Sequence, residues 1–211
     1  MLMYFVEKGF CIMSDHYYSS KPETAHDRQM LAVDLRGFSL KLTSDAGVFS
    51  KNGVDYGSRV LINAMDLTGA KAILDVGCGY GPIGITAAKL VPDAIVTMLD
   101  INERAVELAR HNAIQNQVSS NTVIKQSDRL EAVRNQLFDV ILTNPPIRAG
   151  KEIVHSIFEQ AYEQLRVGGS LWIVIQKKQG APSAREKLSS MFKYVEEVTK
   201  DKGYRIFRAE K

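Results

Sequence analysis

The residues with the clearest chemical meaning are two adjacent prolines and the asparagine before them. Asn144, Pro145, Pro146 and Ile147 directly follow an apolar stretch, residues 138–143, that predicts a buried strand. The prolines have no N–H to donate and they stiffen the chain, so the carbonyl groups between them can be aimed rigidly at a ligand. Asn144 adds one side-chain amide oxygen. The segment therefore predicts a set of fixed hydrogen-bond acceptors at the end of a strand.

A second segment places three glycines just after another apolar strand. Gly77, Gly79 and Gly81 remove the side chains that would keep a ligand away from the backbone, and the proline that follows suits the first turn of a helix. Residues 79–84 also fit the dinucleotide fingerprint G-x-G-x-x-G, which is weak evidence by itself. Asp75, ahead of the glycines, departs from the usual opening of that fingerprint. It offers an acceptor to an ammonium group, such as that of S-adenosylmethionine, whereas a pyrophosphate needs only donors.

Further polar residues follow the next two predicted strands. Asp100 comes after the strand at 95–99, about twenty residues beyond the glycines, where doubly wound folds place a carboxylate on ribose hydroxyls. This spacing suits NAD and S-adenosylmethionine equally. Ser127 and Asp128 end the third strand, where Asp128 either accepts from an adenine amino group or caps the next helix. The residues alone leave both roles open.

These segments resemble the motifs of a known enzyme class. The run from Asp75 to Gly81 resembles motif I of class I S-adenosylmethionine-dependent methyltransferases, and Asn-Pro-Pro is similar to the tetrapeptide of amino methyltransferases. A finer resemblance, to the rRNA small-subunit methyltransferase C family, rests on residues 47–51, 55–58, 144–151 and 171–178. That family methylates guanine N2 in 16S rRNA. The resemblance implies that a target guanine is held by the catalytic residues Asn144, Pro145, Pro146 and Ile147.

The resemblance also implies the cofactor and its contacts. The cofactor would be S-adenosylmethionine, leaving S-adenosylhomocysteine, and the segments around Phe49 and Asp55 would lie near it. The implied cofactor residues are Asp75, Gly77, Cys78, Gly79, Asp100, Ile101, Ser127, Asp128 and Asn144. We expect no metal, because the four histidines are scattered without the spacing of paired ligands.

The implied partner is 16S rRNA or the small ribosomal subunit. A formal net charge of +3 permits a nucleic-acid partner without requiring one. Arg148 and Lys151 follow the proline motif at once, so they would meet a backbone phosphate, and we add Phe49 and Lys51 as candidate RNA contacts. Longer family members carry a second, degenerate methyltransferase-like domain, and we expect this chain to represent a short single-domain form.

Two other functions compete with this interpretation. The nearer one is the same chemistry on another nitrogen, adenine N6 in RNA or DNA or a protein glutamine. The farther one is a non-catalytic RNA-binding assembly module that keeps the cofactor loop, although Asp100 and Asn144 both argue for catalysis.

The elements that position these residues alternate between strand and helix. Apolar runs predict strands at residues 72–75, 95–99, 122–125, 138–143 and 170–176. Helical periodicity appears at 83–90, at 103–115 with Asn102 as N-cap, and at 153–165, closed by Gly168 and Gly169; residues 128–136 are amphipathic. A capping-box pattern at 183–186 predicts a short helix to residue 192. Residues 193–199 and 204–209 predict a hairpin.

The fold class follows from this order. We predict an α/β protein with a doubly wound, mostly parallel seven-stranded sheet, the Rossmann-like methyltransferase fold, ending in an antiparallel hairpin. A small N-terminal β-hairpin at 30–42, broken at Gly37, and a helix at 55–65 precede it. We expect one domain over residues 14–211, divided into 14–66 and a core at 67–211.

The composition of the chain indicates its domain number and its cellular compartment. Of 211 residues, 45% are hydrophobic, which suffices for one core. Residues 1–13 have neither the basic start nor the cleavage site of a signal peptide, so we interpret them as an N-terminal extension. With no apolar run of membrane-spanning length and two cysteines far apart, we expect a reduced cytoplasmic protein, more simply a monomer than an oligomer.

Overall fold

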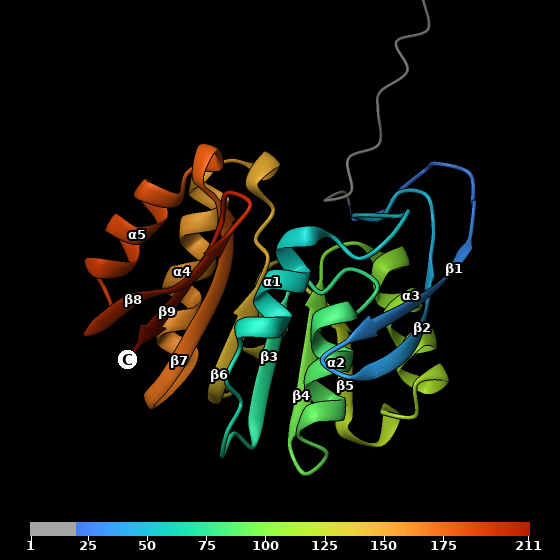
Figure 1. Ribbon diagram of the computed structural model, residues 1–211, viewed down its shortest axis with the longest axis horizontal. Coiled ribbons are helices and arrows are strands. Elements are labelled where there is room, and N and C mark those ends of the chain that lie inside the picture. The colour runs from blue at the N-terminus through green and yellow to red at the C-terminus, as the bar shows by residue number, and fades with distance from the viewer. Residues whose placement is uncertain (1–19) are drawn as a thin grey trace, which may run out of the picture.

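The structure is a computed structural model that describes residues 20–211. Its main sheet has seven strands, drawn in Figure 1: β3 (Ala72–Val76), β4 (Ile95–Asp100), β5 (Thr122–Gln126), β6 (Phe138–Thr143), β7 (Leu165–Gln176), β8 (Tyr194–Asp201) and β9 (Tyr204–Glu210). Their order across the sheet is β5-β4-β3-β6-β7-β9-β8. The five strands from β5 to β7 are parallel, and β9 is antiparallel to both neighbours. The predicted fold class is confirmed.

Helices cover both faces of this sheet. They are α1 (Tyr56–Ala64), α2 (Pro82–Leu90), α3 (Glu103–Gln115), α4 (Lys151–Gln164) and α5 (Ala181–Ser189). Successive residues of a strand point to opposite faces, so Ile73 belongs to the core under α1, α2 and α3, and Leu74 to the core under α4 and α5. Both side chains are fully buried, which explains why the strand reads as a continuous apolar run.

The sheet reverses its order between β3 and β6. The chain builds β4 and β5 outward on one side of β3, then returns to build β6 and β7 on the other. The loops after β3 and β6 therefore part at this point, which leaves a crevice at the carboxyl ends of the strands, where doubly wound folds bind their ligands.

Three local predictions are corrected. Gly168 and Gly169 do not close a helix, because α4 ends at Gln164 and both glycines lie in β7 beside a register shift against β6. The capping box at 183–186 is wrong, because α5 begins earlier, with Gly180 as its N-cap. Residues 128–136 hold only a short 3-10 helix, η2 (Glu131–Val133). Each error came from a local pattern that tertiary packing overrode.

The N-terminal hairpin forms as predicted. β1 (Gln29–Leu35) pairs antiparallel with β2 (Phe38–Ser44) across a two-residue turn at Arg36 and Gly37, both with positive φ. The expected N-terminal extension lies outside the described residues. Among residues 20–211, no helix combines the length and apolar character needed to cross a membrane.

Two asparagines of α3 attach this hairpin to the main body. Asn112 accepts a hydrogen bond from the Thr43 N–H (2.7 Å) and donates to the Thr43 carbonyl (2.9 Å) and the Tyr80 carbonyl (2.8 Å). Asn116, one helical turn later, pairs in the same way with the N–H and carbonyl of Lys41. The two side chains thus bond to the backbone along the outer edge of β2, as a neighbouring strand would. Asn112 also connects that edge to the glycine turn through its bond to the Tyr80 carbonyl.

We predict that Asn112→Ala lowers the free energy of unfolding by about 2–4 kcal/mol, because it leaves the buried carbonyl of Tyr80 and the partly buried N–H and carbonyl of Thr43 without partners. Urea unfolding measures the change. His111→Ala, at an exposed position on the same helix, is the matched control and should change little. Equal unfolding midpoints for the two variants would show that the asparagine pairing does not hold the hairpin.

Candidate active site

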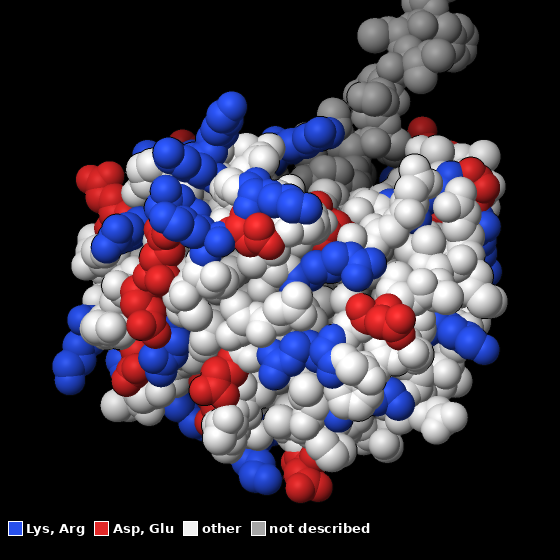
Figure 2. Space-filling view, in the orientation of Figure 1, with Lys and Arg blue, Asp and Glu red and all other residues white. Residues whose placement is uncertain are grey.

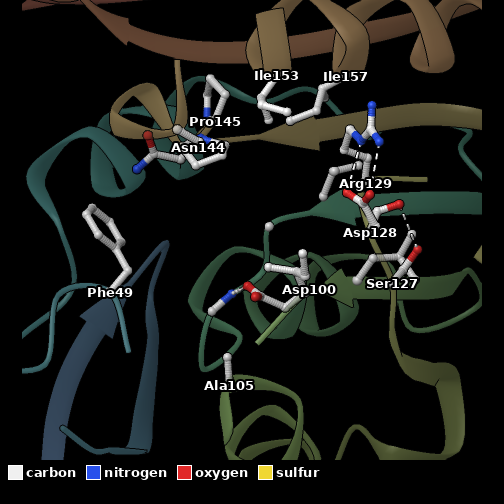
Figure 3. A pocket seen from close by; sticks show the side chains of 17 residues that line it. Phe49, Asp100, Ala105, Ser127, Asp128, Arg129, Asn144, Pro145, Ile153 and Ile157 are labelled. Carbon is white, nitrogen blue, oxygen red and sulfur yellow. Dashed lines mark hydrogen bonds and ion pairs between the residues drawn. The ribbon is translucent and has the colours of Figure 1, made fainter. Parts of the chain in front are cut away.

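A pocket of about 290 Å³ opens at the carboxyl ends of β3, β4, β5 and β6, at the lower end of the usual range for small-molecule sites. Figure 3 shows Asp100 on one wall and Ile153 and Ile157 on the opposite wall, with Phe49 and Asn144 at one end. The residues that line it are Phe49, Val76, Gly77, Gly79, Leu99, Asp100, Ile101, Ala105, Ser127, Asp128, Arg129, Asn144, Pro145, Pro146, Ala149, Ile153 and Ile157. The pocket therefore combines most of the predicted cofactor residues with the proline motif.

The glycine turn between β3 and α2 shapes one side of the pocket. Gly77, Gly79 and Gly81 have φ values of 72°, 56° and 97°, in the left-handed region that favours glycine. The N–H groups of Gly77 and Cys78 both donate to the Leu99 carbonyl at the end of β4, at 2.8 and 2.9 Å. A Cβ at Gly77 or Gly79 would meet nothing within 4 Å, so the backbone itself faces open space there.

Two aspartates fix the ends of this turn. Asp100 accepts hydrogen bonds from the N–H of Gly79 (2.8 Å) and of Asn102 (2.9 Å). Asp75, fully buried behind the turn, accepts from the N–H of Gly84 (2.8 Å) in the first turn of α2. Its other oxygen, Oδ1, is buried without a hydrogen-bond partner among the described residues. An unpaired buried acceptor costs stability, which indicates a site prepared for a donor.

Burial shifts the acidity of both carboxyl groups. It raises the pKa of Asp75 to about 7, against the opposing effect of the Gly84 hydrogen bond, and the nearby Asp100 charge raises it further. Desolvation raises the pKa of Asp100 to about 6, although the N–H groups of Asn102, Gly79 and Ile101 oppose the shift. A positive charge near these two groups would favour their charged forms. Of the two, Asp100 lines the pocket, and Asp75 lies buried behind it.

The end of β5 supplies the third side of the pocket. The Ser127 hydroxyl accepts a hydrogen bond from the Ala132 N–H in η2 at 3.0 Å, so Ser127, and not Asp128, supplies the side-chain acceptor for that short helix. Asp128 instead pairs with Arg129 through two hydrogen bonds of 2.9 Å, and this pairing lowers the pKa of Asp128. Both Ser127 and Asp128 line the pocket, with Asp128 charged.

The end of β6 carries the asparagine. The Thr143 hydroxyl donates to the Val76 carbonyl (2.8 Å), which holds the end of β6 against the end of β3. Asn144 follows directly, and its Nδ2 donates to Asp55 Oδ2 and to Ser58 Oγ, both at 3.0 Å. Pro145 is buried and lines the pocket together with Pro146. The amide and the proline carbonyls thus stand beside the glycine turn.

Residues that sequence reasoning missed hold the Phe49 loop in place. Asn102, which caps α3, donates from Nδ2 to the Gly47 carbonyl at 2.8 Å. Arg104, nearly buried, donates to the Ala46 carbonyl at 2.6 Å. Both residues lie shortly after Asp100, two and four positions later, and this proximity was the only hint in the sequence that they belong to the site. The fold is needed to show that they reach the loop before Phe49.

Some predicted site residues lie away from the pocket wall. Asp75 and Cys78 are buried behind the turn, and Ile147, in the 3-10 helix η3 (Ile147–Ala149), packs against the core under α4. Lys51 pairs with Asp27. Arg148 and Lys151 are exposed on the segment after the proline motif. In the described part of the chain, no three His, Cys, Asp or Glu side chains gather as a metal site requires.

Comparison with known proteins identifies the family. Residues 39–208 match the methyltransferase small domain family, and this match covers most of the chain. The chain belongs to that family. Its fold is that of the class I S-adenosylmethionine-dependent methyltransferases, and the pocket lies at the carboxyl ends of the strands, where doubly wound folds bind their ligands.

Relatives of this methyltransferase differ in length. The uncharacterized protein YbxB of Bacillus subtilis is 53% identical over 201 residues, which cover 94% of this chain and 100% of that protein. The ribosomal RNA large subunit methyltransferase G of Pseudomonas fluorescens is 33% identical, with 82% of this chain and 47% of that protein covered. The chain thus spans about half the length of the methyltransferase G relatives.

A solved structure with the same fold is the 16S rRNA N2 methyltransferase RsmC of T. thermophilus in complex with AdoMet and guanosine. The TM-score is 0.75 and the sequences are 24% identical, with 90% of this chain and 52% of that chain covered. This likeness establishes the fold.

We predict that the stability of the ligand-free methyltransferase rises as the pH falls from 7 to 6. The pKa of Asp75 is raised on folding, so below about pH 7 the folded state binds a proton that the unfolded chain, with a pKa near 3.8, does not bind. Because Asp75 is about half protonated at pH 7, the free energy of unfolding should increase by about 1 kcal/mol between pH 7 and pH 6.

Asp75→Asn should remove most of this slope and leave the smaller part that Asp100 contributes, whereas Asp93→Asn, at an exposed position, should keep the whole slope. Urea unfolding at pH 8, 7 and 6 measures the slopes. A wild-type curve that is flat or falls toward pH 6 contradicts the raised pKa.

Proposed function

We propose that this chain transfers a methyl group from S-adenosylmethionine to the exocyclic N2 amine of a guanine in 16S rRNA. The observation that carries the proposal is the position of Asn144, Pro145 and Pro146 at the end of β6, beside the glycine turn and within one pocket. A cofactor site and a set of fixed acceptors for an amine then share one cavity. The resemblance to the small-subunit methyltransferase C family supports the choice of guanine N2.

The pocket residues fit S-adenosylmethionine by their chemistry, and when bound that cofactor supplies an activated methyl group on a sulfonium. Asp100 would accept hydrogen bonds from the ribose hydroxyls, and Ser127 and Asp128 would bind the adenine end. Asp75, with its unpaired oxygen, would favour the ammonium of the methionine end. The apolar Ile153 and Ile157 would exclude water from the space between.

The acceptors at the end of β6 would align the amine. The lone pair of guanine N2 is delocalised into the ring, so the amine is a weak nucleophile. Hydrogen bonds from it to the Asn144 side-chain oxygen and the Pro145 carbonyl would turn the lone pair toward the methyl group and stabilise the developing positive charge. The proton becomes acidic once the methyl is attached, so no strong base is needed. The guanine must leave its stack to enter the pocket.

Surface charge supports an RNA partner. Because β6 and β7 are parallel neighbours, η3 and η4 (Lys177–Gln179), which follow them, lie at the same edge of the sheet. Figure 2 shows Lys and Arg side chains gathered over this part of the molecule. Lys177 and Lys178 belong to η4, and Lys202 lies in the turn between β8 and β9. We place this reaction in the cytoplasm. An RNA strand that delivers a base to the pocket would pass over this basic surface.

Labelled methyl transfer tests the proposed function. The protein is incubated with labelled S-adenosylmethionine and either small ribosomal subunits, naked 16S rRNA or a peptide release factor, and the RNA is digested to nucleosides. We expect label in N2-methylguanosine. Label in N6-methyladenosine or in a protein glutamine would move the activity to another nitrogen, and no transfer to any substrate would favour a binding module.

We predict that Asn144→Ala slows single-turnover methylation by about a hundredfold to a thousandfold, the usual cost of losing one acceptor or donor that acts in the transition state. Titration calorimetry should give a nearly unchanged dissociation constant for the cofactor, because the amide matters when the amine is aligned. Near-normal turnover by the variant contradicts this role.

We predict the opposite pattern for Asp100→Ala. Loss of a charged acceptor for the ribose hydroxyls should weaken cofactor binding by about 1.5–3 kcal/mol, while turnover at saturating cofactor survives. Calorimetry measures the binding, and Asp93→Ala is the exposed control. An unchanged dissociation constant excludes Asp100 as the ribose ligand.

The exposed basic side chains after the proline motif allow a test of RNA binding. If Arg148 and Lys151 hold phosphates, replacing both with Ala should flatten the slope of log K against log salt for RNA binding by roughly 1–2 units and leave cofactor affinity unchanged. Lys41 and Arg134, both exposed, form the control pair. Equal slopes for the two double variants would place the RNA-binding surface elsewhere.

A further inference from the structure

The first turn of α1 binds the side-chain NH₂ of Asn144 through hydrogen bonds. Asp55, the N-cap of α1, accepts on Oδ2 a hydrogen bond from the Ser58 N–H (3.2 Å) and one from Asn144 Nδ2 (3.0 Å). Ser58 Oγ, buried in the same turn, accepts the second hydrogen bond from Asn144 Nδ2. Neither Asp55 nor Ser58 lines the pocket, so both act on the site only through Asn144.

The chemistry of these partners decides which end of the amide faces them. An ionised carboxylate only accepts hydrogen bonds, so it must meet the NH₂ of Asn144 and repels the amide oxygen. A serine hydroxyl can donate or accept, so Ser58 suits either orientation. The Asp55 charge is therefore what turns the amide oxygen of Asn144 away from α1 and leaves it available as an acceptor.

We propose that Asp55 is a positioning residue that makes Asn144 a hydrogen-bond acceptor toward the substrate, so the site selects a target that donates an N–H. This inference rests on the proposed function and adds the reason for its preference for amines. A flipped amide would offer its NH₂, and it would suit a carbonyl oxygen on the target instead of an exocyclic amine.

The turn between β8 and β9 braces the part of α1 that carries Asp55. The Tyr56 hydroxyl donates to Asp201 Oδ2 at 2.5 Å, and the Tyr56 and Tyr204 rings lie 5.8 Å apart. A Cβ added at Gly57 would come within 2.8 Å of the Tyr204 ring, so the backbone of α1 lies directly against this turn. The C-terminal hairpin thereby sets the place of Asp55 relative to Asn144.

Asp55→Ser separates the positioning role from the capping role, because a serine hydroxyl can donate to Asn144 as well as accept from it. Serine caps a helix as well as aspartate, so α1 should keep its N-terminus and the melting temperature should stay within about 2 °C. The amide of Asn144 can then take either orientation. We expect single-turnover methylation of the substrate to slow at least tenfold, with unchanged affinity for S-adenosylmethionine.

Ser58→Ala is the matched control, because it removes one partner of Asn144 Nδ2 without removing the charge that orients it. Its rate should fall by less than threefold. A wild-type rate for Asp55→Ser overturns the proposal, and so does an equal loss in both variants.

A measurement without substrate keeps this test independent of the proposed function. In the wild type, the Asn144 side-chain NH₂ should exchange slowly with solvent in nitrogen-labelled NMR spectra, and Asp55→Ser should speed that exchange at least tenfold. If no RNA or protein accepts a methyl group, the proposed function fails while the exchange data still decide the amide orientation. Rapid exchange in the wild type overturns the proposed orientation.

Discussion

The site depends on two aspartates, the fully buried Asp75 and the pocket-lining Asp100, that fix a glycine turn in a conformation other residues rarely adopt. Asp100 takes the N–H of Gly79 and Asp75 takes the N–H of Gly84, so the turn is held at both ends while its exposed backbone faces the pocket. Both charges are costly to bury, and burial raises both pKa values. The N–H groups of Gly79, Asn102 and Gly84 offset part of this cost, and a ligand with positive charge and donors, such as the S-adenosylmethionine that we propose, would offset more of it.

Much of the fold could be predicted because its strands and helices are locally consistent. The inner parallel strands β4, β3 and β6 and the second half of β7 are buried on both faces, so their apolar runs are continuous, and α3 has both the periodicity and the N-cap that its bounds require. The errors fell where local patterns compete with packing. Gly168 and Gly169 resemble a helix end, but β7 extends through them and pairs at its start with β6.

The candidate site was predictable in part for a related reason. Doubly wound topology brings the carboxyl ends of strands together, so residues that follow strands, such as Asp100, Ser127 and Asn144, were expected to meet. The contacts that orient them were not predictable. Asn144 and Asp55 are 89 residues apart, and nothing in either segment indicates that one binds the other. Asn112 similarly reaches Thr43 across 69 residues.

The measurement that tests the central claim most directly is mass spectrometry of 16S rRNA from a strain that lacks this gene, beside its parent. The account predicts that one N2-methylguanine disappears from 16S rRNA and returns when the intact gene is restored. An unchanged set of N2-methylguanines in 16S rRNA would contradict the account. A methyl group lost from the large-subunit rRNA or from a protein would then identify the true substrate.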